Sequence, residues 1–290
     1  MIFIAIILSL LPLSIASANV FQYNKDISVI GSIKEYKING NESLIEIARR
    51  FGLGYNEIVS ANPELDPFIP KNNTVAVIPS SWILPHVDIY NGIVINLSEM
   101  RLYYFFKKDG KDVVRTFPIG IGDEGKDTPT GSFRIIEKKE KPSWYVPESI
   151  RKERAHLPKV VPPGPNNPLG SHALRLSLSS YLIHGTNRPW AVGRRVTNGC
   201  IRLYPEDIPE LFKLVPIGTP VTIIRQPVKV GIKNNKTYIE VHYDDYKKNI
   251  NYMNEAMKLL SDKKLLNHVN TERLYNALNL KNGIPIEISD

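Results

Sequence analysis

The chain has very little cysteine: Cys200 is the one thiol among 290 residues. A single thiol cannot form an internal disulfide, and it cannot build a structural zinc site of the usual thiolate kind. After the first 18 residues, the chain also lacks any apolar run near the roughly 20 residues that a membrane-spanning helix needs. We therefore expect a soluble mature protein that uses no metal.

The first 18 residues differ from the rest of the chain. Residues 2–15 are almost wholly apolar, and the run ends in Ala16-Ser17-Ala18, which puts small residues at positions −3 and −1 of a signal peptidase site. The run is too short for a membrane anchor. We predict a signal peptide, residues 1–18, that is cleaved after Ala18 and exports the protein to the periplasm. An unpaired thiol in an oxidising compartment suggests a working cysteine, although a buried inert one is the alternative.

The basic residues are spread along the chain instead of forming a patch. The formal net charge is +8. In an exported protein, a positive net charge favours anionic envelope polymers over nucleic acid as partners. An ordinary solvated surface explains the positive charge equally well. The glycines of Gly120-Ile121-Gly122-Asp123-Glu124-Gly125 satisfy a nucleotide-loop pattern, but Asp127, Pro129 and Gly131 forbid the helix that such a loop must open. We expect neither a nucleic acid nor a nucleotide ligand.

Residues 34–79 read as a small α+β module of strand, helix, helix and strand. Apolar residues recur at helical spacing from Ser43 to Gly52, a second short helix covers 55–61, and strands are expected at 33–38 and 75–79. Ser43 or Asn41 can cap the first helix. The module resembles a LysM domain, which binds the glycan strands of peptidoglycan, through Tyr36, Leu44, Ile47, Ala48, Ala61-Asn62-Pro63 and Val77-Ile78-Pro79. We expect it to target the protein and to be dispensable for the chemistry.

Residues 89–226 read as a mainly β domain. Strands are expected at 93–97, 102–106, 113–119, 132–137 and 173–184, with a helix at 205–214 and a closing strand at 220–225. Residues 227–290 form a partly helical C-terminal extension, with one strand-rich stretch at 238–242 and helices near 249–262 and 271–278. The extension carries no recognisable chemistry.

The chemistry concentrates around His184 and Cys200. His184 closes an expected strand, and Cys200 follows Gly199 after a loop of fifteen residues. A thiol attacks as its thiolate, and a nearby imidazole can take its proton. Consecutive backbone amides at Asn198, Gly199 and Cys200 would suit an oxyanion hole. Spacing alone leaves open a purely structural histidine.

The pattern His184-Gly185-Thr186, then Thr197-Asn198-Gly199-Cys200-Ile201-Arg202, resembles the signature of the L,D-transpeptidase (YkuD-type) catalytic domain. Matching stretches occur at 118–122, 128–133, 161–165 and 167–170. The resemblance implies a β-sandwich-like fold with a Cys200–His184 pair and the Gly185 carbonyl as third member. It also implies substrate contacts for three further residues: Arg202 near a carboxylate, Thr197 and Trp190. Asn198 stands where the family commonly has histidine.

The resemblance implies acyl transfer without a cofactor. Cys200 would attack the diamino acid of a peptidoglycan tetrapeptide stem and release D-alanine. An amine of another stem would then take the acyl group in a 3–3 crosslink, or an amine of an outer-membrane lipoprotein would. Two alternatives stay open: a non-catalytic peptidoglycan-binding envelope protein, and an L,D-carboxypeptidase or cysteine peptidase that only hydrolyses.

Overall fold

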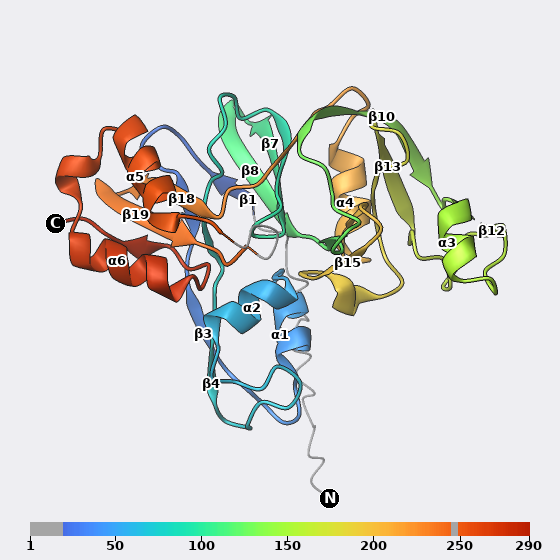
Figure 1. Cartoon of the computed structure of the whole chain (residues 1–290), viewed down its shortest axis with the longest axis horizontal. Coiled ribbons are helices and arrows are strands. Elements are labelled where there is room, and N and C mark those ends of the chain that lie inside the picture. The colour runs from blue at the N-terminus through green and yellow to red at the C-terminus, as the bar shows by residue number, and fades with distance from the viewer. Residues whose placement is uncertain (1–19, 245–248) are drawn as a thin grey trace, which may run out of the picture.

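A computed structural model describes residues 20–244 and 249–290 (Figure 1). The predicted signal peptide, residues 1–18, lies outside the described residues. Within them, the central feature is a nine-stranded sheet in the order β1-β8-β7-β6-β17-β10-β13-β14-β16. Its strands are β1 (Val20–Gln22), β6 (Gly92–Asn96), β7 (Arg101–Lys108), β8 (Lys111–Pro118), β10 (Gly131–Glu140), β13 (His172–Leu176), β14 (Leu182–His184), β16 (Ile201–Arg202) and β17 (Pro220–Ile224).

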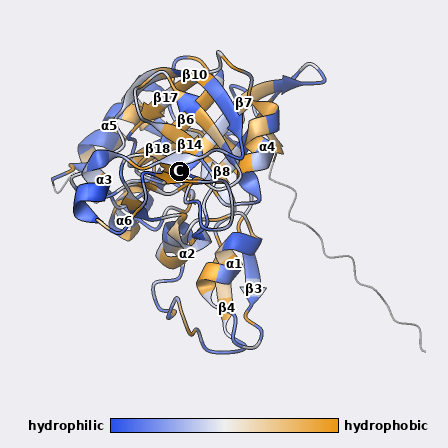
Figure 2. Ribbon diagram, turned by 90° about the vertical axis from the view of Figure 1, so that its right-hand side faces the viewer, coloured by the Kyte–Doolittle hydropathy of each residue, from blue (hydrophilic) through white to orange (hydrophobic). Residues whose placement is uncertain are grey.

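The sheet curls around helix α4 (Asp207–Leu214), as Figure 1 shows. Neighbouring strands pair antiparallel except for β6 with β17 and β14 with β16. Along β6 and β7, alternate side chains enter different cores: Ile93 and Leu102 pack in the core with α4, whereas Val94 and Tyr103 face the N-terminal segment. This explains why β6 and the first part of β7 have consecutive buried residues, and why the ribbon of β6 is coloured hydrophobic in Figure 2. The mainly β character expected for residues 89–226 is confirmed.

One strand prediction was wrong. The stretch expected as a single strand at 173–184 is divided into β13 and β14, which pair antiparallel and place Ala173 opposite His184. Ser180, at the turn between them, has a positive φ of 70°. The reversal is what brings His184 back along the sheet toward the Cys200 segment.

The N-terminal segment contains β2 (Val29–Gly31), β3 (Lys34–Lys37), α1 (Leu44–Arg50), α2 (Tyr55–Ala61), β4 (Val75–Ile78) and β5 (Ser81–Ile83). Strands β3 and β4 pair antiparallel, so residues 34–79 have the expected order of elements. Ser43 caps α1 through a capping box with Glu46. Whether this module is a LysM domain stays a prediction.

The C-terminal extension has its own core. Strands β18 (Val228–Lys233), β19 (Lys236–Val241) and β20 (Ile286–Glu287) form a sheet covered by α5 (Tyr252–Asp262) and α6 (Thr271–Leu280). A short 3-10 turn, η2 (Leu266–His268), joins the helices. The two expected helices are present, and the structure adds β18 and β20, which the sequence analysis missed.

A flap projects from the end of β10 and β13 (Figure 1, right). It contains β11 (Trp144–Tyr145), α3 (Glu148–Glu153) and β12 (Val160–Val161). The remaining elements are β9 (Ile121–Gly122), the 3-10 turn η1 (Pro189–Ala191) and β15 (Arg195–Thr197), which pairs with β9. No helix in the described part of the chain is both long and apolar enough to cross a bilayer.

Candidate active site

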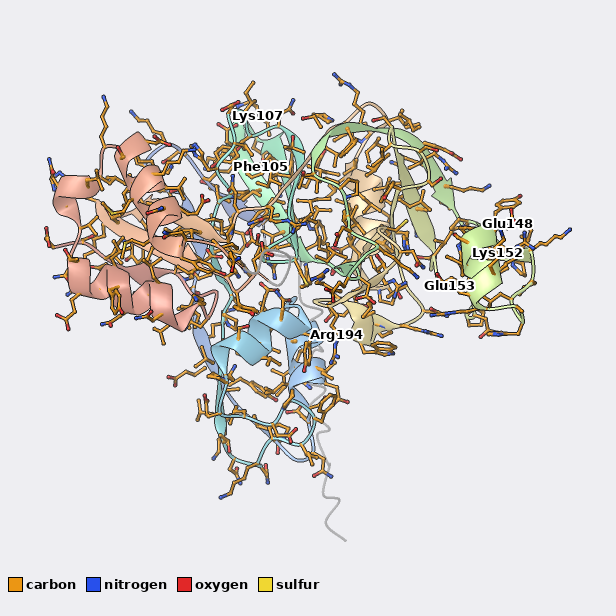
Figure 3. The ribbon with its side chains drawn as sticks, in the orientation of Figure 1. Phe105, Lys107, Glu148, Lys152, Glu153 and Arg194 are labelled. Atoms are coloured by element: carbon orange, nitrogen blue, oxygen red, sulfur yellow. The ribbon has the colours of Figure 1, made fainter. Side chains whose placement is uncertain are left out.

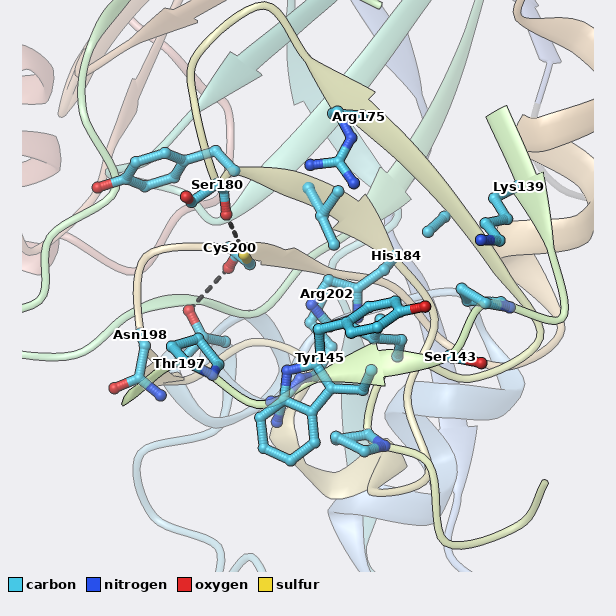
Figure 4. Close-up of a pocket in the computed structure, with 18 of the residues that line it drawn as sticks. Lys139, Ser143, Tyr145, Arg175, Ser180, His184, Thr197, Asn198, Cys200 and Arg202 are labelled. Atoms are coloured by element: carbon cyan, nitrogen blue, oxygen red, sulfur yellow. Dashed lines mark hydrogen bonds between the residues drawn. The ribbon is translucent and has the colours of Figure 1, made fainter. Parts of the chain in front are cut away.

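The sheet brings His184 and Cys200 to the same place. Strands β14 and β16 run parallel, with Ile183 opposite Ile201 and His184 opposite Arg202. Cys200 therefore enters the sheet beside the strand that His184 ends. Both side chains line one cavity (Figure 4).

Two threonine hydroxyls hold the backbone around Cys200. Thr197 Oγ1 donates to the Cys200 carbonyl at 2.7 Å and accepts the Gly199 N–H at 3.1 Å. Thr128 Oγ1 donates to the Gly199 carbonyl at 2.8 Å. Gly199 has a φ of 97°, and a methyl group on it would lie 2.7 Å from the Tyr181 ring, so glycine is required there.

These bonds occupy one of the three backbone amides that were predicted to form the oxyanion hole. The Gly199 N–H is directed to Thr197 and is not presented to the cavity in this structure. Thr197 lines the cavity and its hydroxyl also braces the turn that carries the thiol, so its contact with the substrate stays a prediction. The amides of Asn198 and Cys200 are the two remaining candidates. Thr128 belongs to the matching stretch 128–133, but the sequence analysis assigned it no role at the site, because it lies 72 positions before Cys200 (200 − 128).

His184 is buried, with 3% of its surface exposed, and its Nδ1 lies 2.6 Å from the Gly185 carbonyl oxygen. A proton on Nδ1 that this carbonyl accepts leaves the ring lone pair on Nε2. Burial lowers the pKa of His184 to about 3, and the nearby Arg202 charge adds to the effect, against the weaker pull of hydrogen bonds to the Gly185 and Leu169 backbone. The imidazole is therefore neutral at physiological pH.

Burial raises the pKa of the Cys200 thiol, although the Leu182 backbone and the Arg202 charge oppose the shift. Its sulfur lies 3.6 Å from the Ser180 carbonyl oxygen, which accepts the thiol proton (Figure 4). The thiol and the imidazole are thus both uncharged at rest, and the attacking thiolate has to form when the substrate arrives.

The cavity has a volume of about 510 Å³ and is enclosed between the sheet and the flap. Aromatic side chains of the flap, Trp144 and Tyr145, form one wall, as Figure 4 shows for Tyr145. Thr197, Asn198 and Arg202 line it as well. Trp190, which was expected to contact the substrate, lies on η1 with 48% of its surface exposed and does not line the cavity. The aromatic residues at the site come instead from the flap, which carried no sequence signal for this role.

Arg202 supplies a positive charge inside the cavity. Its Nε is buried and, among the described residues, has no hydrogen-bond partner. Burial and the charge of Arg188 lower the pKa of Arg202. By contrast, Arg175 at the same cavity is paired with Glu137, Nε to Oε2, at 2.6 Å. Arg202 is the better candidate for binding a carboxylate of a ligand.

A cluster with metal-ligand geometry occurs elsewhere in the described part of the chain. Glu99, Glu240 and His242 lie together in the buried contact between the central sheet and the C-terminal extension. Lys229 already occupies this cluster, because its Nζ lies 2.7 Å from Glu99 Oε2 and 2.8 Å from Glu240 Oε1. An ammonium group thus already lies between the two carboxylates, where a cation would bind, and the cluster does not fit a metal.

Comparison with known proteins identifies what the chain is similar to. The family model for the L,D-transpeptidase catalytic domain, YkuD, matches residues 90–223. The probable L,D-transpeptidase YcfS of Escherichia coli is 37% identical over 266 residues, which cover 86% of this chain and 81% of that protein. The probable L,D-transpeptidase YbiS of the same organism is 45% identical over 210 residues, covering 70% of this chain and 67% of that protein.

Proposed function

Because the chain belongs to the L,D-transpeptidase family, we propose that Cys200 is its acyl-accepting nucleophile and that His184 is the base. The observation that carries the proposal is the shared cavity, which holds the one thiol of the chain, a buried imidazole oriented by Gly185, and the Arg202 guanidinium. The thiol and the imidazole are the nucleophile and the base that acyl transfer needs, and the guanidinium can hold a substrate carboxylate.

The reaction starts from the neutral pair. His184 Nε2 takes the thiol proton while Sγ bonds to the carbonyl carbon of the third stem residue, a diamino acid. The amides of Cys200 and Asn198 stabilise the oxyanion. The tetrahedral intermediate collapses by breaking the bond to the D-alanine nitrogen, which leaves with the proton from His184. The product is an acyl-thioester on Cys200 and free D-alanine.

The second half of the reaction repeats these roles for an amine. His184, neutral again, removes a proton from the acceptor amine as its nitrogen attacks the thioester, and the thiol is regenerated. An amine of another stem gives a 3–3 crosslink, and an amine of an envelope lipoprotein gives attachment to the wall. Water in the same position gives a shortened stem.

Arg202 is proposed to bind a stem carboxylate. Arg202 lines the cavity, and no ion pair with a carboxylate of the described residues neutralises its guanidinium, so a substrate carboxylate can form a charge-assisted bond with it. The flap aromatics Trp144 and Tyr145 would cover the bound stem. The module at 34–79 is proposed to bind glycan strands as a LysM domain, and residues 1–18 to direct the enzyme to the periplasm.

Purified wall fragments incubated with the protein test the activity. Mass spectrometry should show 3–3 linked or lipoprotein-linked products with loss of D-alanine. Cys200→Ala should remove this activity and keep its fold, because the substitution leaves the bracing hydroxyls of Thr197 and Thr128 in place. Shortened stems alone would select hydrolysis. No product from a folded protein that a carbapenem also fails to acylate at Cys200 would select a non-catalytic envelope-binding role.

A further inference from the structure

We propose that the first turn of α2 positions the loop that carries Cys200, so that the N-terminal module is part of the active site's support. The inference rests on the proposed role of Cys200. It departs from the sequence-based expectation that the module only targets the enzyme. Three sets of contacts carry it.

The first contact is direct. The backbone N–H groups of Tyr55 and Asn56 donate to the carbonyls of Val192 and Gly193, each at 3.2 Å. The chains approach so closely here that a methyl group on Gly193 would lie 2.1 Å from the Tyr55 nitrogen. A methyl group on Gly54 would likewise lie 2.9 Å from the Gly193 Cα. Two glycines thus meet where the module touches the segment between His184 and Cys200.

A side chain closes over the same junction. The Arg194 guanidinium carbon lies 3.5 Å from the centroid of the Tyr55 ring, and Figure 3 shows Arg194 beside α2. The contact adds a cation–π interaction next to the two backbone bonds. The junction therefore combines backbone and side-chain contacts from consecutive residues on both sides.

The second set of contacts links this junction to Cys200. Beyond Gly193, the Arg194 carbonyl accepts the Ile121 N–H at 3.1 Å, and β15 pairs with β9. Strand β15 ends at Thr197, whose hydroxyl donates to the Cys200 carbonyl. Gly199 lies only six positions after Gly193 (199 − 193), so a shift at Gly193 acts on the bracing hydroxyl of Thr197 through a short segment.

The third set fixes α2 itself against the central sheet. The fully buried Arg101 of β7 makes two bonds to Glu57 of α2, Nε to Oε1 at 3.0 Å and Nη2 to Oε2 at 2.7 Å. Its guanidinium stacks on the Trp82 ring at 4.0 Å, and Trp82 donates to Glu57 Oε1 at 2.8 Å. Glu57 Oε2 also accepts the Gly54 N–H at 2.7 Å. The start of α2 is therefore held rigidly enough to locate a neighbouring loop.

Tyr55→Pro in the full-length chain is a sharp perturbation of this contact. Tyr55 is the first residue of α2, where proline is tolerated by a helix, and Gly54 has the extended φ and ψ (−85°, 164°) that a residue before proline needs. Proline deletes the N–H that Val192 accepts and puts a ring carbon in its place, so the loop has to move. Tyr55→Ala is the matched control, because it loses the ring and keeps the amide.

The readout is the first-order rate of Cys200 acylation by a saturating carbapenem, followed by intact mass, with the thermal midpoint of each variant. We expect Cys200 in Tyr55→Pro to be acylated at least 10-fold more slowly than in the natural chain. The acylation rate of Tyr55→Ala should stay within about 3-fold of the natural rate. The concentration for half-saturation should change less than the rate. A role in stability alone would lower the fraction of folded, reactive protein and leave the rate of that fraction unchanged.

Gly54→Ala provides a second variant, since its φ suits alanine and the added methyl meets Gly193. Ile58→Val, in the core of the module, is its control for lost packing. Normal acylation by folded Tyr55→Pro and folded Gly54→Ala would overturn the positioning role while the proposed function stands. If the natural chain itself is not acylated, both proposals fail together.

Discussion

Cys200 should carry its proton in the resting enzyme at neutral pH, instead of forming a thiolate–imidazolium pair. The His184 pKa of about 3 lies four units below pH 7, so about one molecule in 10⁴ carries the imidazolium. Charging that ring costs about 5 kcal/mol at pH 7, at 1.36 kcal/mol per unit. Burial also raises the pKa of Cys200, which opposes the thiolate from the other side.

A neutral pair has a characteristic pH profile. Neither group titrates between about pH 5 and pH 8, so the first-order acylation rate by a carbapenem should change by less than about 3-fold across that range. An ion pair would instead show thiolate absorbance near 240 nm throughout the same range. The measurement is the 240 nm absorbance from pH 5 to pH 10, with Cys200→Ser as the matched blank. An absorbance difference at pH 7 that corresponds to one thiolate per molecule would refute the reasoning.

The same shift predicts a loss of stability in acid. The folded pKa of His184, about 3, lies below the ordinary value of 6.5, so the unfolded chain binds a proton that the native state excludes. The resulting loss of folding stability is absent above about pH 6.5 and grows progressively as the pH falls toward 3. At pH 4.5 it amounts to about 3 kcal/mol, and His184→Gln lacks it. Urea unfolding at pH 7 and pH 4.5 measures this effect. Between these two pH values, the free energy of unfolding of the variant should fall by about 3 kcal/mol less than that of the natural chain.

Three further outcomes are expected. Arg202→Gln should slow acylation by tetrapeptide stems about 10- to 100-fold, the equivalent of one charge-assisted bond, and should barely affect a donor that lacks the terminal carboxylate. Lys229→Met should destabilise the fold by about 3–5 kcal/mol in urea unfolding at pH 7.5, because it removes the ammonium partner of the buried Glu99 and leaves Glu240 paired with His242 alone. Asn198→Ala should be acylated at a rate within about 3-fold of the natural rate, since residue 198, whose side chain is exposed, is expected to act through its backbone amide. A 10²–10³-fold loss would show that its side chain is the donor.

The fold was predictable where one periodic signal dominates. The helical spacing from Leu44 to Phe51 and the apolar strand 92–96 gave elements within a few residues of those observed. The failure at 173–184 has a clear cause, because the apolar alternation continues through a turn whose key residue, Ser180, looks unremarkable. Strands β18 and β20 were missed because their pairing depends on a core shared with α5 and α6.

The site was predictable for the residues that a short motif contains and poorly predictable elsewhere. Cys200, His184 and Arg202 lie close to one another in the sequence and share the cavity. Trp144 and Tyr145 reach the cavity through the flap, and Thr128 supports Gly199 from a distant loop, neither of which sequence spacing encodes. Trp190 lies within the motif region, so the sequence suggested that it contacts the substrate. In the structure it lies on η1 and is not among the residues that line the cavity.

The docking of the module on the Cys200 loop could not be inferred from residue types, since its donors and acceptors are backbone groups. The sequence suggested a domain boundary near Pro79, but packing does not end there. One core joins Ile38 and Leu44 of the module to Val94, Tyr103 and Phe105 of the central sheet. Cutting after residue 79 would expose that face of the sheet to water and remove β1 and β2 from their partner strands. A truncated chain that folds with an ordered Cys200 loop is therefore expected to need the residues from β1 onward, whatever the module binds.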